Sequence, residues 1–197
     1  RNLDLPLLPA PLIGRGEEIA EAQRLISEDG VRLLTLTGPP GVGKTSLALA
    51  VAHELADAFR YGARFVDLAP IENPHLVAVA IADGLGVSRS GERDPLEQIV
   101  RFVRDRRLLL VLDNFEHLLP AAARPLAELA AAAPSLRLVV TSRKTLRIQG
   151  EIELDLPPLA NGEAVALFVE RAQAVRAGVA EDETVHELCA RLDRLPL

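Results

Sequence analysis

The sequence predicts an α/β fold, in which a parallel sheet has helices on both faces and a small helical subdomain follows the sheet. Short, almost uninterrupted apolar segments alternate with segments of helical periodicity, which is typical of strands buried on both faces of a parallel sheet. A glycine-rich segment joins the first such strand to a long helix. After Pro157 and Pro158 the periodicity is purely helical, so we place a boundary near residue 157.

The elements follow from the periodicity in chain order. Ile19, Ala22 and Ile26 recur at helical spacing and predict an amphipathic helix over 16–27. The segment 44–59 predicts a helix that is apolar on more than one face, and the alternation in 151–156 predicts an edge strand. The other strands are expected at 32–37, 63–69, 108–113 and 136–142. The other helices are expected at about 74–84, 95–105, 120–132 (with Pro120 near its start), 161–176 and 181–193, with an exposed loop at 86–94.

Composition restricts the classes of function. Of the 197 residues, 49% are hydrophobic and 3% aromatic, so the core is aliphatic and few rings are available for stacking bases. The net charge of −6 gives no chain-wide basic footprint for DNA. The single cysteine, Cys189, fits a reducing compartment, and no apolar segment approaches the roughly 20 residues that span a bilayer. We therefore expect a cytoplasmic protein without a membrane partner. The chain starts at Arg1 and stops at Leu197 without a natural-looking end, so we also expect a fragment truncated at its C-terminus.

A complete phosphate-binding motif follows the first strand. Its residues are Gly38, Pro39, Pro40, Gly41, Val42, Gly43, Lys44 and Thr45, which match G-x-x-x-x-G-K-[ST]. The glycines let successive backbone N–H groups point at a phosphate, and the next helix adds its positive N-terminal end. Lys44 supplies a charge to the β- and γ-phosphates, and Thr45 offers a hydroxyl to Mg²⁺. Ser46 is also expected to contact the nucleotide. The motif predicts a P-loop NTPase that binds a nucleoside triphosphate.

The apolar strand 108–113 ends on an acid. In P-loop proteins such an acid holds Mg²⁺, although Asp113 could instead cap the next helix. Asn114 stands where many such enzymes have a second carboxylate, and an amide can orient a water molecule but cannot take its proton. Glu116 is the nearest alternative base, or else a solvated acid at a helix start.

A cation follows the strand 136–142. Ligands of parallel α/β sheets bind at the carboxyl ends of strands, so Arg143 is placed where its guanidinium could contact the γ-phosphate. Lys144 is the competing cation, and a surface salt bridge is the alternative role for Arg143. We expect Lys44, Asp113 and Arg143 to be the residues that support any hydrolysis.

Six ordered segments cover the chain from about Pro11 to Leu197. They are LIGRGEEIAEAQRLI, LTGPPGVGKTSLALAVA, LLLVLDNFEHLL, LRLVVTSRKTL, LPPLANGEAVALFVERA and LCARLDRLPL. Their residues and order resemble the NB-ARC branch of the STAND class of signalling ATPases, as found in bacterial transcriptional regulators of the LuxR and antibiotic-regulatory-protein types. The resemblance implies a P-loop domain over 1–157, an ARC1-like helical subdomain over 158–197, and ATP or ADP with Mg²⁺ as the ligands.

The resemblance also implies roles for residues near both ends of the chain. The family's hhGR motif matches Leu12, Ile13, Gly14 and Arg15, whose apolar pair and backbone would contact the adenine. The residues alone leave open that this segment is ordinary core. The GLPL motif matches Arg194, Leu195, Pro196 and Leu197, where Pro196 would pack on the adenine and help to lock the ADP state. Arg194 in place of glycine is a departure from the family pattern, as is Asn114 in place of a second acid.

Other side chains are read as structural. Leu167, Phe168, Ala172 and Val175 share one face of the helix expected at 161–176 and predict the core of a helical bundle. Cys189 lies on a helical face and is expected to be core as well.

These observations predict an ATP/ADP-binding regulatory switch module of a multidomain regulator. Hydrolysis would be slow at most, because Asn114 lacks a carboxylate, and the nucleotide would control self-association into a homo-oligomer. The partners would be the nucleotide and other domains of the same full-length chain, and this segment itself would not bind DNA. The alternatives are a genuine P-loop enzyme, either a mechanical ATPase or a kinase, and a nucleotide-dependent scaffold that does not hydrolyse.

Overall fold

The computed structural model describes residues 5–8, 12–87, 94–176 and 178–196. Most of the loop expected at 86–94 and the last motif residue, Leu197, lie outside the described residues. None of the described helices is long and apolar enough to cross a membrane.

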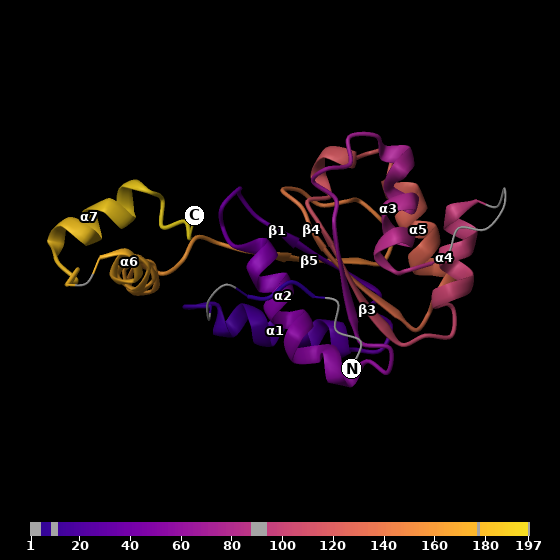
Figure 1. Ribbon diagram of the computed structural model, residues 1–197, viewed down its shortest axis with the longest axis horizontal. Helices are drawn as coiled ribbons and strands as arrows, with labels where there is room; N and C mark the ends of the chain where they lie inside the picture. Colours follow the sequence, from indigo (N-terminus) through magenta and orange to yellow (C-terminus); the bar gives the residue numbers. More distant parts are fainter. Residues whose placement is uncertain (1–4, 9–11, 88–93, 177, 197) are drawn as a thin grey trace.

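Five parallel strands form one sheet, which confirms the predicted fold class (Figure 1). The strands are β1 (Leu33–Thr37), β2 (Ala63–Asp67), β3 (Leu108–Asp113), β4 (Leu136–Thr141) and β5 (Glu151–Asp155). Their order is β2-β3-β4-β1-β5, and each neighbouring pair is parallel. The alternating segment β5 therefore lies at an edge of the sheet, as its pattern predicts.

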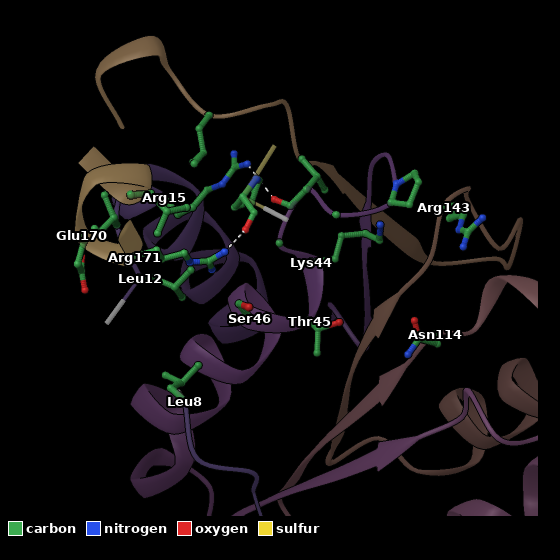
Figure 2. Close-up of a pocket in the computed structure, with 18 of the residues that line it drawn as sticks. Leu8, Leu12, Arg15, Lys44, Thr45, Ser46, Asn114, Arg143, Glu170 and Arg171 are labelled. Carbon is green, nitrogen blue, oxygen red and sulfur yellow. Dashed lines mark hydrogen bonds between the residues drawn. The ribbon is translucent and has the colours of Figure 1, made fainter. Parts of the chain in front are cut away.

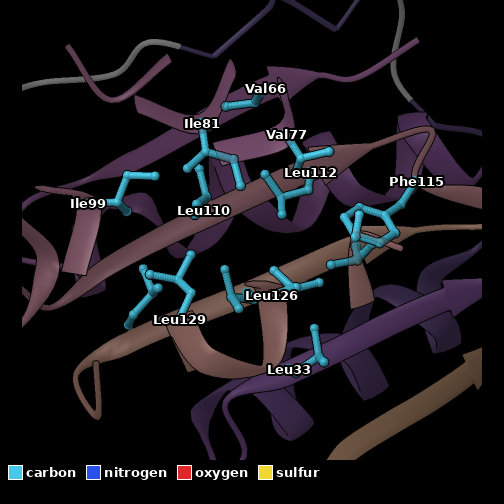
Figure 3. Close-up of a cluster of buried hydrophobic side chains, with 14 of the residues drawn as sticks. Leu33, Val66, Val77, Ile81, Ile99, Leu110, Leu112, Phe115, Leu126 and Leu129 are labelled. Carbon is cyan, nitrogen blue, oxygen red and sulfur yellow. The ribbon is translucent and has the colours of Figure 1, made fainter. Parts of the chain in front are cut away.

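Helices cover both faces of the sheet. On one face lie α1 (Gly16–Ser27) and α2 (Lys44–Leu55), and on the other lie α3 (Val77–Gly84), α4 (Pro95–Val103) and α5 (Ala123–Ala132). Successive residues of a strand point to opposite faces. Leu110 and Leu112 accordingly pack under α3, α4 and α5 (Figure 3), while Leu109 and Val111 pack under α1 and α2. Because both faces of β3 are buried, this strand has apolar residues at every position up to its last.

Some helix ends differ from the expectation. The helix expected from residue 120 begins at Ala123, and a 3₁₀ turn over Glu116–Leu118 precedes it. Pro120 follows a cis peptide bond and lies between these two elements, so its expected place in the first turn of the helix is wrong. The helix expected from residue 74 likewise begins at Val77, after a 3₁₀ turn over Pro74–Leu76.

Two further helices, α6 (Asn161–Val175) and α7 (Glu183–Arg191), lie beside the sheet and form a helical pair (Figure 1). Their small core contains Ala164, Val165, Val185 and Cys189. The expected core position Val175 is wrong, because it lies in the last turn of α6, beyond the apolar contacts with α7, and is 90% exposed.

The topology determines where a ligand can bind. In a parallel sheet the carboxyl ends of all strands meet at one edge, and β1 has β4 and then β3 as neighbours on one side. The loop after β1, the end of β3 and the end of β4 are therefore close together. These are the segments that hold Lys44, Asp113 and Arg143.

Candidate functional site

The loop between β1 and α2 has a backbone that its glycines make possible. Gly38 and Gly43 have φ angles of +140° and +96°, in the region that favours glycine. A Cβ atom on Gly38 would lie 2.8 Å from the carbonyl oxygen of Leu156. The Nζ atom of Lys44 donates hydrogen bonds of 2.9 Å to the carbonyls of Gly38 and Pro39, which holds the ammonium group over the loop. Burial lowers the pKa of Lys44.

Asp113 and Thr45 lie side by side at the base of this loop. The Thr45 hydroxyl is 2.8 and 3.0 Å from the two carboxylate oxygens of Asp113, and Thr141 at the end of β4 donates a third hydrogen bond of 2.5 Å. Burial raises the pKa of Asp113, while the hydrogen bonds from Thr141 and Thr45 oppose this rise. A hydroxyl and a carboxylate are hard oxygen ligands of the kind that Mg²⁺ prefers. Within the described ranges, no three His, Cys, Asp or Glu side chains gather into a site that the protein alone could complete.

Asn114 is fixed by its neighbours in a left-handed conformation with a φ angle of +62°. Its backbone N–H donates to the Thr141 hydroxyl at 3.0 Å. Its side-chain amide donates to Asp113 at 3.0 Å and to Asp67 at 3.4 Å, so one amide bridges two carboxylates. Asp67 ends β2 in register with Asp113, and this juxtaposition follows from the strand order.

Glu116 and Arg143 form an ion pair beside Lys44. The Nε atom of Arg143 lies 2.8 Å from one carboxylate oxygen of Glu116, and the side chain of Glu116 is only 17% exposed. Both residues line the same cavity as Lys44. Lys144, the competing cation, is not among the residues that line this cavity. The structure thus brings Arg143 rather than Lys144 to the site and places Glu116 there as well.

Four parts of the chain line a cavity of about 380 Å³ (Figure 2). This volume is in the range of small-ligand sites. Figure 2 shows Lys44, Asn114 and Arg143 at one end, and Leu12, Glu170 and Arg171 at the other. The lining residues come from the N-terminal segment (Leu8, Leu12, Ile13, Arg15), the P-loop and α2 (Pro40, Gly41, Val42, Gly43, Lys44, Thr45, Ser46), the strand ends (Asn114, Glu116, Arg143) and the helical pair with its flanks (Leu159, Leu167, Glu170, Arg171, Pro196).

The N-terminal segment is tied to the loop and to α6. The buried guanidinium of Arg15 donates to Glu18 at 2.6 Å and to the carbonyl of Val42 in the P-loop at 3.1 Å. Gly14 has a φ angle of +71°, and a Cβ atom there would lie 2.7 Å from the carboxyl carbon of Glu163 in α6. These contacts position Leu12 and Ile13 against the cavity.

The C-terminal segment reaches the cavity through Pro196. A Cβ atom on Gly43 would lie 3.4 Å from the Cγ atom of Pro196, so this proline lies directly over the P-loop. Arg171 of α6 donates a hydrogen bond of 2.6 Å to the carbonyl of Pro196. Leu195, by contrast, packs against the core under α1 and α2 and is not a lining residue.

Not every expected site residue faces the cavity, and some lining residues were not anticipated. Gly14, Gly38, Pro39, Asp113 and Leu195 support the site from behind its lining. The lining residues missed by the sequence interpretation are Leu8, Leu159, Leu167, Glu170 and Arg171. The available signal was the helical spacing of Leu167, Glu170 and Arg171, which places these three residues on one side of α6.

The fold and the P-loop define a P-loop ATPase, and sequence comparison then gives the family. A family model described as "AAA domain" matches residues 27–148, which is more than half of the chain. The chain belongs to this family.

The relatives are larger proteins. An uncharacterized protein of Mycobacterium tuberculosis is 37% identical over 190 residues, which cover 94% of this chain and 48% of that protein. A protein of the same species named "Putative HTH-type transcriptional regulator" is 42% identical over 171 residues, which cover 84% of this chain and 19% of the relative. The regulatory protein AfsR of Streptomyces griseus is 32% identical over 205 residues, which cover 98% of this chain and 20% of AfsR. The chain thus spans about half of the first relative and about a fifth of the other two.

Solved structures share the fold. Cdc6p of Pyrobaculum aerophilum has a TM-score of 0.70 at 21% identity, over 97% of this chain and 58% of that one. A STAND protein with a tetratricopeptide repeat sensor from Pyrococcus horikoshii has a TM-score of 0.65 at 20% identity, over 98% of this chain and 30% of that one. At such identities the likeness concerns the fold alone.

Proposed function

We propose that this chain is the ATP/ADP-binding switch module of a multidomain regulator, of the STAND class and its NB-ARC branch. The observation that supports this most is the composition of the cavity. One end consists of the P-loop and the strand ends, and the other end is lined by α6 and by Pro196, which lies in the segment after α7. A ligand that fills such a cavity contacts both parts of the chain, so its identity can influence their arrangement.

In this proposal the chain has two parts, a P-loop domain over 1–157 and an ARC1-like helical subdomain over 158–197. The apolar core of α6 and α7 is separate from the two cores of the sheet, which supports the division. Leu12, Ile13 and Pro196 would contact the adenine, with Gly14 and Leu195 holding their neighbours in place. The P-loop from Gly38 to Thr45, with Ser46, would hold the phosphates.

The end of the cavity formed by the P-loop and the strand ends, which we call the phosphate end, carries oxygen ligands that fit Mg²⁺. Thr45 and Asp113 would hold the ion, and the nucleotide phosphates would supply further oxygens. When bound, Mg²⁺ would neutralise phosphate charge. Lys44 would bind the β- and γ-phosphates, Arg143 would contact the γ-phosphate, and Asn114 would keep Asp113 oriented through its amide.

Hydrolysis would be slow, since Asn114 provides no carboxylate next to Asp113. ADP would favour the closed arrangement in which Pro196 lies over Gly43. ATP would favour a different arrangement of the helical subdomain. Such a shift requires that the two nucleotides make different contacts in the two states. The γ-phosphate end of the cavity is where those contacts would differ.

The relatives support the wider context of this proposal. Their names include an HTH-type transcriptional regulator and the regulatory protein AfsR. We propose that other domains of the full-length cytoplasmic regulator bind DNA, that this module does not, and that exchange of ADP for ATP permits assembly into a homo-oligomer.

The test is the nucleotide that the purified chain retains and the rate at which the chain turns ATP over. Mass spectrometry should find ADP, and wild-type turnover should stay far below about ten per second. A turnover above that rate without a partner would favour a genuine ATPase or kinase. The Lys44→Ala variant serves as the control, because unchanged nucleotide binding in it would contradict the P-loop assignment itself.

A further inference from the structure

We propose that Glu116 is the nucleotide-discriminating residue of this site: it holds Arg143 when ADP is bound, competes with the γ-phosphate of ATP for that arginine, and so sets the preference of the site for ADP. This inference rests on the proposed function, because it concerns the ligands of the same cavity. It assigns a role to a carboxylate that the P-loop motif does not include.

The Glu116–Arg143 ion pair joins the ends of two neighbouring strands. Glu116 lies in the 3₁₀ turn after β3, and Arg143 follows β4, the neighbouring strand. Their side chains meet at 2.8 Å, and both line the cavity together with Lys44. The charges of Glu116 and Arg143 act on Lys44 in opposite directions, Glu116 raising and Arg143 lowering its pKa. A γ-phosphate bound by Lys44 would therefore be close to one cation and one anion.

The two carboxylate oxygens of Glu116 differ in their partners. One carboxylate oxygen of Glu116 forms the ion pair with Arg143, but the other, Oε2, is buried and has no hydrogen-bond partner among the described residues. Buried polar atoms are normally satisfied, so an unpaired carboxylate oxygen at a cavity calls for a functional explanation. A carboxylate with a single partner is more readily released from it than one held on both oxygens. Arg143 is thus able to leave Glu116 when another anion competes for it.

The neighbouring amide of Asn114 is held by other carboxylates. Asn114 also lines the cavity, but its amide already donates to Asp113 and Asp67. Glu116 and Arg143, by contrast, can change partners without disturbing these two carboxylates. ADP leaves the pair intact, whereas ATP must either draw Arg143 away and leave the Glu116 carboxylate uncompensated, or bind without the full charge of the arginine.

The experiment compares the affinities of the full 197-residue chain for ADP and for a non-hydrolysable ATP analogue. Calorimetry with Mg²⁺ would be performed on wild type and on Glu116→Gln, whose amide keeps the shape of the side chain but not its charge. Removing the carboxylate charge should shift the affinity ratio toward the ATP analogue by about tenfold, mostly through tighter binding of the analogue. The added effect of Glu116→Gln should shrink in an Arg143→Ala background, because no competition for the arginine remains there.

Glu128→Gln is the matched control. Glu128 also pairs with an arginine, Arg124, at 2.8 Å, but on α5 outside the cavity, so the ratio should not change. An unchanged ratio in Glu116→Gln, with both nucleotides still bound, would overturn this inference and leave the proposed function standing. A lower turnover without any change in the ratio would also overturn it and would instead make Glu116 a base. Loss of binding in wild type would refute the proposed function itself.

Discussion

Asn114→Asp is the substitution that most directly tests how the phosphate end is built. The wild-type amide donates to Asp113 at 3.0 Å and to Asp67 at 3.4 Å. An aspartate keeps the size of the side chain and also tolerates the left-handed backbone found at this position. The substitution therefore replaces two attractive contacts with two contacts between carboxylates and changes little else.

The cost follows from these distances. Two unit charges at such separations repel each other by roughly 1 kcal/mol in water and by roughly 5 kcal/mol at an effective dielectric constant near 20. Asp113 is buried but Asp67 is exposed, so an intermediate value applies, and we expect a loss of about 2 kcal/mol in the free energy of unfolding. For a chain of 197 residues this corresponds to a decrease in Tm of about 4 to 8 °C.

Thermal unfolding of the nucleotide-free chain would measure this loss at neutral pH and again near pH 4. Protonation of the carboxylates removes the repulsion, so the difference in free energy of unfolding between wild type and Asn114→Asp should become smaller as the pH falls. Asn73→Asp is a suitable control, because the exposed Asn73 side chain only accepts a hydrogen bond, from His75 at 3.0 Å, and an aspartate does this equally well. A second substitution, Asp67→Asn, should recover part of the loss in the Asn114→Asp background.

An Asn114→Asp variant as stable as wild type at neutral pH would refute the bridging role of the amide. ATP turnover belongs in the same experiment. The proposal that Asn114 keeps hydrolysis slow requires Asn114→Asp, or Asn114→Glu, to turn ATP over faster. If neither does, that explanation fails whatever the stability result.

Three other substitutions test separate parts of the site. Lys44→Ala should weaken nucleotide binding about 100-fold by removing the charge at the β- and γ-phosphates, as measured by calorimetry. Asp113→Asn should abolish the Mg²⁺ dependence of nucleotide binding. Because burial raises the pKa of Asp113, the stability of wild type relative to this variant should be highest at low pH and should fall as the pH rises through that pKa. Unfolding curves recorded at several pH values would show this. Pro196→Ala should speed ADP dissociation about threefold by removing ring contacts over Gly43, with stopped-flow release as the measurement and an unchanged rate as the contrary result.

The strands and the P-loop could be predicted because their signals are local. A strand buried on both faces, such as β3, must be apolar at consecutive positions, and the phosphate loop requires glycine at fixed offsets. The helix starts were less predictable. Pro120 fits the first turn of a helix equally well, but the chain first forms the 3₁₀ turn at Glu116–Leu118.

The parts of the site that were missed depend on non-local geometry. Asp67 meets Asn114 only because β2 neighbours β3, and Thr141 reaches Asp113 only because β4 lies on the other side. The periodicity of a single segment contains no information about strand order. Arg171 lines the cavity because of the way α6 approaches the P-loop, which the apolar face of α6 does not specify.

The neutral side chain at position 114 is expected to affect binding as well as turnover. Close to the phosphate end lie the carboxylates of Asp67, Asp113 and Glu116 and the cations of Lys44 and Arg143. An acid at position 114 would add a further negative charge where we expect a polyphosphate to bind, and Mg²⁺ would then have to compensate for it. An amide avoids this and still orients Asp113. The proposal that Asn114 keeps hydrolysis slow thus extends to retention: we expect the same residue to make nucleotide retention long, which is the combination that a regulatory switch requires.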